Sequence, residues 1–136
     1  MTLSDYLDAA REQRWQWGVV DCSLFASDWV RMVTGKDPAE GLRGTYSTQD
    51  EARAVIAREG GFVPMVRERF ERCGLADTFD PQDGDVGIIR VPVGGFQDEM
   101  PVVGAILGIR HCGLWVAKAA YGIRAGEFPH LFAWRV

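Results

Sequence analysis

A cysteine follows an aspartate at the head of a strongly helical run, in the segment Asp21-Cys22-Ser23. A thiol is nucleophilic only as the thiolate, and a helix N-terminus lowers a thiol pKa through its unpaired N–H groups and its dipole. The same N–H groups can receive the oxyanion that develops when an amide is attacked. This arrangement is typical of a catalytic cysteine. The alternative is a core residue in the first turn of a helix, because free cysteines are among the most buried residue types.

The other cysteines give no sign of a disulfide framework or a metal centre. The three cysteines, at positions 22, 73 and 112, are odd in number and widely spaced, which favours free thiols in a reducing compartment. Structural zinc sites show paired ligand spacing, and the chain has no C-x-x-C pair. A zinc site made from the cysteines with His111 and His130 is the disfavoured alternative. We therefore expect no metal and no cofactor.

Helices are predicted in the first half of the chain, where apolar residues recur with helical spacing. The helix that begins at Cys22 carries a broad apolar stripe and stops at Gly35 and Pro38. Thr48 and Glu51 form a capping box for another helix. The four predicted helices span residues 3–10, 22–33, 48–59 and 63–73.

Strands are predicted after Pro81, where the apolar runs become short and bounded by glycine or proline. They span residues 86–89, 102–109, 114–116 and 131–136, and the segment 93–99 is predicted to be the longest irregular surface. Helices followed by strands predict an α+β domain in which the Cys22 helix packs on an antiparallel sheet.

Composition limits the classes of protein and partner. A chain of 136 residues suits a single domain over residues 1–136. The net charge of -4 disfavours nucleic acid as a partner. The sequence contains no run near the roughly 20 apolar residues that a membrane span needs, so we expect no membrane association. The N-terminal segment reads as an amphipathic helix without the apolar core of a signal peptide.

Three motifs occur in a characteristic order: Trp15-x-Trp17-Gly18, Asp21-Cys22-Ser23 and Gly84-Asp85-Val86. In this order they resemble the NlpC-type cell-wall peptidases, which are compact papain-like cysteine peptidases. The resemblance covers residues 12–118. A short chain without a signal peptide is similar to the members encoded among the tail genes of phages and prophages, which implies a bacterial cytoplasmic or virion location.

The resemblance implies a papain-like fold and a role for each residue of the motifs. Cys22 would be the nucleophile, and the N–H groups of Cys22 and Ser23 would hold the oxyanion. Trp15 stands where the family carries an aromatic residue, usually tyrosine, whose hydroxyl assists the oxyanion. Trp17, Ser23 and Val102 would line the substrate cleft. The implied substrate is a peptide, with the stem peptides of peptidoglycan as the reference case.

The sequence departs from the family at the position of the catalytic base. Val102 stands at the position of the base histidine, and Ala117 stands near that of the third polar residue. His111 follows Val102 by nine residues, so roughly 20 Å or more would separate it from the expected base position. His130 therefore remains the candidate base. Asp21 is interpreted as a helix cap, with a role as a catalytic acid as the alternative.

Two hypotheses of different classes follow. In the first, the protein is a papain-fold peptidase or amidase in which Cys22 attacks and His130 serves as the base. In the second, it is a non-catalytic tail or assembly component that binds a partner protein through the same cleft. The absence of a histidine at position 102 favours the second hypothesis, and the Asp-Cys-Ser motif favours the first.

Overall fold

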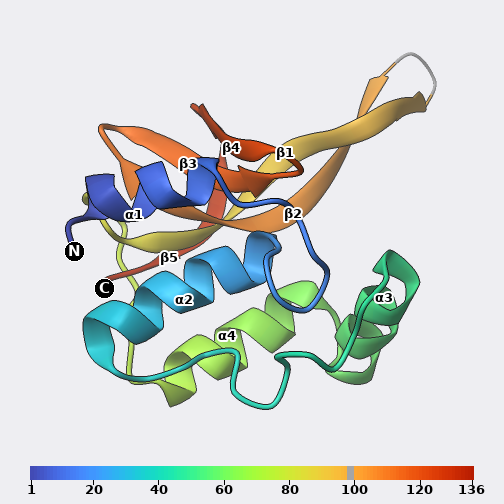
Figure 1. Ribbon diagram of the computed structural model, residues 1–136, viewed down its shortest axis with the longest axis horizontal. Coiled ribbons are helices and arrows are strands. Elements are labelled where there is room, and N and C mark those ends of the chain that lie inside the picture. Colours follow the sequence, from blue (N-terminus) through green and yellow to red (C-terminus); the bar gives the residue numbers. More distant parts are fainter. Residues whose placement is uncertain (98–99) are drawn as a thin grey trace.

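In the computed structural model, four helices precede a five-stranded antiparallel sheet (Figure 1). The elements are α1 (Leu3–Arg11), α2 (Cys22–Thr34), α3 (Gln49–Arg58), α4 (Phe62–Arg72), β1 (Val86–Gln97), β2 (Met100–His111), β3 (Leu114–Ala119), β4 (Gly122–Gly126) and β5 (His130–Trp134). The structure describes residues 1–97 and 100–136, and the side chains of residues 1–92 and 103–136. The prediction of an α+β fold with an antiparallel sheet is confirmed.

The helices begin and end where local signals predict. Asp21 caps α2, and Gly35 ends it in the left-handed conformation with φ 76°. Thr48 caps α3 by accepting a hydrogen bond from the Glu51 N–H at 3.1 Å. In the part of the chain that the structure describes, no helix is long and apolar enough to cross a membrane.

The sheet has the strand order β4-β3-β2-β1-β5. β1, β2 and β3 contain three of the four predicted strands, and β5 overlaps the fourth, predicted over residues 131–136. β4 was not predicted. The expectation of an irregular surface over residues 93–99 is wrong in part, because β1 continues to Gln97 and β2 begins at Met100. These ends pair with each other and project from the body as an arm (Figure 1). Pairing between β1 and β2 outweighed the tendency of Pro92 and Gly94-Gly95 to interrupt a strand. Residues 98 and 99 lie outside the described part of the chain.

The sheet must curl strongly, because its two edge strands are also consecutive in sequence. β4 ends at Gly126 and β5 begins at His130. Four residue steps span at most about 14 Å, whereas the edges of a flat five-stranded sheet would lie about 19 Å apart. The curl therefore brings β4 and β5 toward each other and separates the two faces of the sheet into different environments.

Each face of the sheet has its own apolar cluster. The helix-side cluster joins buried residues of α1, α2 and α4 to Val86, Ile88, Leu107, Ile109, Val116 and Trp134. The opposite face carries Ile89, Val91, Trp115, Ala117 and Ala133, with Phe128 of the β4–β5 linker packed against them. Gly87 pairs with Gly108 in the register of β1 and β2. A Cβ at Gly87 would lie 2.7 Å from the Trp115 ring, so a glycine is needed for the indole to pack there.

Candidate functional site

Cys22 is the first residue of α2, the helix that packs on β2 and β3. In Figure 1 this helix runs beneath the sheet, and α4 lies below it in the same view. The Trp29 indole N–H donates to the Gly84 carbonyl at 2.8 Å, which fixes α2 to the turn that opens β1. The predicted buried helix that begins at Cys22 and packs on the sheet is confirmed.

Asp21 is buried and its carboxylate holds three segments together. One oxygen accepts from the Leu24 N–H at 2.9 Å, which is the helix cap. The other accepts from the Gly18 N–H at 3.1 Å and from the Tyr46 hydroxyl at 2.6 Å. The interpretation of Asp21 as a cap is confirmed. Both oxygens are thus engaged in structural hydrogen bonds.

Tyr46 is a site residue that the motifs did not reveal. Its chain segment passes so close to Gly18 that a Cβ there would lie 2.1 Å from the Tyr46 carbonyl oxygen. Gly18 also has φ +79°, and its carbonyl accepts from the Gly44 N–H at 3.0 Å. Burial, followed by the hydrogen bond to Asp21, raises the pKa of the Tyr46 hydroxyl. The Trp-Gly motif is therefore explained by a close backbone crossing, which only the fold could show.

Cys22 lines a partly open cavity of about 230 Å³. Its walls come from the start of α2, from α3 and α4, from the segment 38–46 and from residues 105–107 of β2. Apolar side chains dominate the lining, namely Trp17, Leu24, Ala39, Leu42, Val55, Ile56, Phe62, Met65, Val66 and Phe70. Arg53 and Gln49 contribute polar groups from α3. The cavity suits an apolar group better than a charged one.

The surroundings of Cys22 disfavour its thiolate form. Burial, followed by the charge of Asp21, raises the pKa of the Cys22 thiol to about 12. Hydrogen bonding from Ser23 and from the Leu107 backbone lowers it only in part. Desolvation and the neighbouring carboxylate therefore outweigh the lowering effect of the helix N-terminus on the thiol pKa.

The two histidines of the chain lie away from Cys22. His130 begins β5, and its ring packs against Trp115, with 5.4 Å between the ring centroids. Trp115 belongs to the sheet face opposite α2. His111 is the last residue of β2, and its Nδ1 lies 3.4 Å from an Asp83 oxygen. The structure thus does not bring His130, the candidate base, to the sulfur.

The strand that meets the Cys22 cavity does so at residues 105–107. Val102 lies five residues before Leu107 on β2, which corresponds to about 16 Å along an extended strand. The side chain of Val102 falls outside the described residues, and so does its predicted place in the substrate cleft. Ala105 and Leu107 are apolar, and neither can accept a proton from the thiol.

The remaining motif residues are divided between the cavity and its edge. Trp17 and Ser23, two of the residues expected at the substrate cleft, line the cavity. Trp15 packs edge-on against Trp17 with 5.0 Å between the ring centroids, and its buried indole N–H has no hydrogen-bond partner among the described residues. Trp15 is not among the residues that line the cavity. It therefore supports the Trp17 wall.

A family model described as "Domain of unknown function (DUF6950)" matches residues 1–136. No curated protein and no solved structure matches the chain.

Proposed function

The chain belongs to the DUF6950 family, and we propose that this member is a non-catalytic relative of the NlpC-type peptidases that binds a peptide segment of a partner protein. The observation that carries this proposal is that both histidines of the chain lie away from Cys22. Burial and the charge of Asp21 also raise the pKa of the Cys22 thiol. Cysteine catalysis requires a thiolate and a group that delivers a proton to the leaving amine.

The cavity supports binding of one apolar side chain. Its volume of about 230 Å³ is below the 300–1,000 Å³ that is common for drug-sized ligands. It exceeds the roughly 150 Å³ of an engineered cavity that holds benzene. An aromatic or branched aliphatic side chain fits this space, and the charged groups of a peptidoglycan stem peptide do not match its apolar lining.

The peptide character of the ligand and the biological setting come from the resemblance. A papain-like cleft accommodates an extended peptide. The motifs Trp17-Gly18 and Asp21-Cys22-Ser23, which carry the resemblance, also stabilise this fold through the hydrogen bonds of Asp21. We place the protein among phage or prophage tail and assembly components, with a tail protein as the partner. A stem-peptide hydrolase is the competing function.

Binding is tested with ten-residue peptides that carry phenylalanine or glutamate at the centre, followed by nuclear magnetic resonance titration. Burial of one apolar side chain contributes about 1.5–3 kcal/mol, so we expect at least about tenfold weaker binding of the glutamate peptide. Ala52→Leu fills the cavity from α3 and should weaken binding of the phenylalanine peptide. Ala54→Leu is the matched control, because Ala54 is exposed on the same helix. Equal binding of both peptides, or equal effects of both variants, would contradict the proposal.

Catalysis is tested with a synthetic peptidoglycan stem peptide, with wild type compared against Cys22→Ala. We expect that neither wild type nor Cys22→Ala catalyses product formation. If wild type cleaves the stem peptide and Cys22→Ala does not, the protein is a peptidase and the proposed non-catalytic binding function is wrong.

A further inference from the structure

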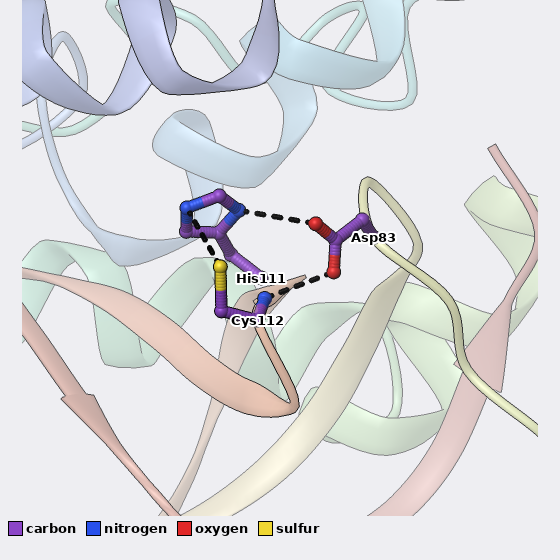
Figure 2. Close-up of side chains that lie close together, drawn as sticks. All are labelled: Asp83, His111 and Cys112. Carbon is purple, nitrogen blue, oxygen red and sulfur yellow. Dashed lines mark hydrogen bonds and ion pairs between the residues drawn. The ribbon is translucent and has the colours of Figure 1, made fainter.

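A second group of chemically active side chains lies at the β2–β3 turn, outside the Cys22 cavity. It consists of Asp83, His111 and Cys112 (Figure 2). His111 ends β2, Cys112 occupies the turn, and Asp83 approaches from the loop before β1. Each residue offers one donor atom, and these atoms all lie within 4.8 Å of one another. This set combines sulfur, nitrogen and oxygen donors in one place.

The turn itself directs these donors. Cys112 and Gly113 both have positive φ, 50° and 75°, between the paired residues His111 and Leu114. This is a two-residue hairpin turn with both central residues left-handed, for which Asn-Gly is the usual sequence. The Cys112 N–H donates to an Asp83 oxygen at 2.9 Å, so the acidic loop is held against the turn. The sulfur, the imidazole and the carboxylate therefore share one corner of the molecule.

The spacing of the donors matches a tetrahedral metal. Zn²⁺ binds sulfur at about 2.3 Å and histidine nitrogen at about 2.0–2.1 Å, so a tetrahedral angle places the two ligands about 3.5 Å apart. The distance between Cys112 Sγ and His111 Nε2 is 3.5 Å. The Asp83 carboxylate is held by the Cys112 N–H and lies on the Nδ1 side of the ring, across from the sulfur. Asp83 therefore supports the imidazole, and the two ligand atoms are Cys112 Sγ and His111 Nε2.

The hydrogen bonding of the His111 ring is incomplete among the described residues. Its Nδ1 is buried and has no hydrogen-bond partner among the described residues, although Asp83 Oδ2 lies 3.4 Å away. A metal on Nε2 fixes the other nitrogen as the N–H form, which then donates to a carboxylate as in metal sites generally. Figure 2 shows the ring between the sulfur and the carboxylate.

We propose that Cys112 Sγ and His111 Nε2 ligate a divalent transition metal ion, with Zn²⁺ as the reference ion, and that Asp83 orients the His111 ring through Nδ1. A thiolate and a carboxylate neutralise a divalent charge. The donor set with thiolate and imidazole selects zinc-like ions over Mg²⁺ and Ca²⁺, which prefer oxygen ligands. Solvent would complete the coordination, because Cys112 lies at the surface. The ion would fix the His111 ring and strengthen its contact with Asp83 of the loop before β1.

The experiment is a calorimetric titration of the reduced wild-type protein with Zn²⁺, with Mg²⁺ in a parallel titration. We expect one Zn²⁺ per chain, release of a proton from the Cys112 thiol, and no binding of Mg²⁺. Cys112→Ser and His111→Gln should each weaken Zn²⁺ binding by at least about 100-fold, and Asp83→Asn by about 10-fold. With Co²⁺ in place of Zn²⁺, a sulfur-to-metal charge-transfer band should appear in wild type and vanish in Cys112→Ser.

Each of these variants has a matched control of the same residue type. These controls are Cys73→Ser, His130→Gln and Asp80→Asn, which should bind Zn²⁺ as wild type does. Circular dichroism of every variant establishes that it is folded. Wild-type binding no tighter than that of Cys112→Ser overturns the proposal, as does loss of binding in Cys73→Ser or a Co²⁺ complex without the charge-transfer band.

Discussion

The two regions that contain a cysteine next to an acidic side chain have opposite chemical character. Cys22 lies at a helix N-terminus inside an apolar cavity, and Asp21 beside it is fully engaged with Leu24, Gly18 and Tyr46. Cys112 lies on an exposed turn with an imidazole and a carboxylate within 4.8 Å. The recognisable motif thus lies in the apolar region, and the exposed group of sulfur, nitrogen and oxygen donors belongs to no motif of the sequence.

This difference shows that a motif records which side chains are adjacent in sequence, whereas reactivity depends on solvation and on neighbours in space. At Cys22 the helix dipole acts on the thiol, but burial and the Asp21 charge oppose it and dominate. The four predictions below test or refine the comparison between the two regions.

The largest expected effect is on thiol labelling by iodoacetamide. A pKa of about 12 gives Cys22 a thiolate fraction about three orders of magnitude below that of a free cysteine with a pKa near 8.5. Cys112 is exposed and should be labelled first, with Cys22 labelled only as the pH rises far above 8. Mass spectrometry of the labelled peptides measures both rates. Rapid labelling of Cys22 at pH 6 would break the comparison and support the peptidase hypothesis.

The next effect is on the stability of the Cys22 region through Gly18. Gly18→Ala places a Cβ 2.1 Å from the Tyr46 carbonyl oxygen and requires φ +79°. We expect a loss of more than about 3 kcal/mol in the free energy of unfolding. Gly35→Ala is the control, because it has φ +76° with nothing within 4 Å, and should cost about 1 kcal/mol. Equal losses in urea denaturation would show that the close crossing is unimportant.

A smaller effect is expected from Asp21→Asn. The asparagine oxygen can still cap α2, but its amide donors would face the Gly18 N–H and the Tyr46 hydroxyl, at a cost of about 2–3 kcal/mol. Loss of the charge also lowers the pKa of Cys22, so Cys22 should label faster at a given pH while Cys112 is unchanged. Asp50→Asn, in the exposed first turn of α3, is the control and should change neither quantity. Unchanged Cys22 labelling would mean that burial alone sets its pKa.

The smallest effect concerns the connection between the two regions. Trp29 of α2 donates to the carbonyl of Gly84, the residue after Asp83. Trp29→Phe removes this hydrogen bond and should lower the free energy of unfolding by about 1 kcal/mol. Zn²⁺ affinity should change by less than about threefold, since the donors at the turn are held by the Cys112–Asp83 contact. A large loss of Zn²⁺ affinity would instead show that the Cys22 helix positions the metal site.

The sequence by itself determined the helices, most of the strands and the antiparallel class of the sheet. Caps at Asp21 and Thr48 and the stop at Gly35 are local signals, because each acts on backbone groups within a few residues. The role of Asp21 as a helix cap could be predicted from the sequence for the same reason. Apolar runs likewise identified β1, β2 and β3, since burial of a strand depends on its own side chains.

Only the tertiary structure decided which side chains meet. The curl of the sheet puts His130 on the face opposite Cys22, and no local pattern encodes that choice of face. The pairing of Asp21 with Tyr46 spans 25 residues, and the approach of Asp83 to Cys112 spans 29. Such contacts depend on how whole elements pack, because hydrogen bonding, burial and metal coordination act over a few ångströms in space whatever the distance along the chain.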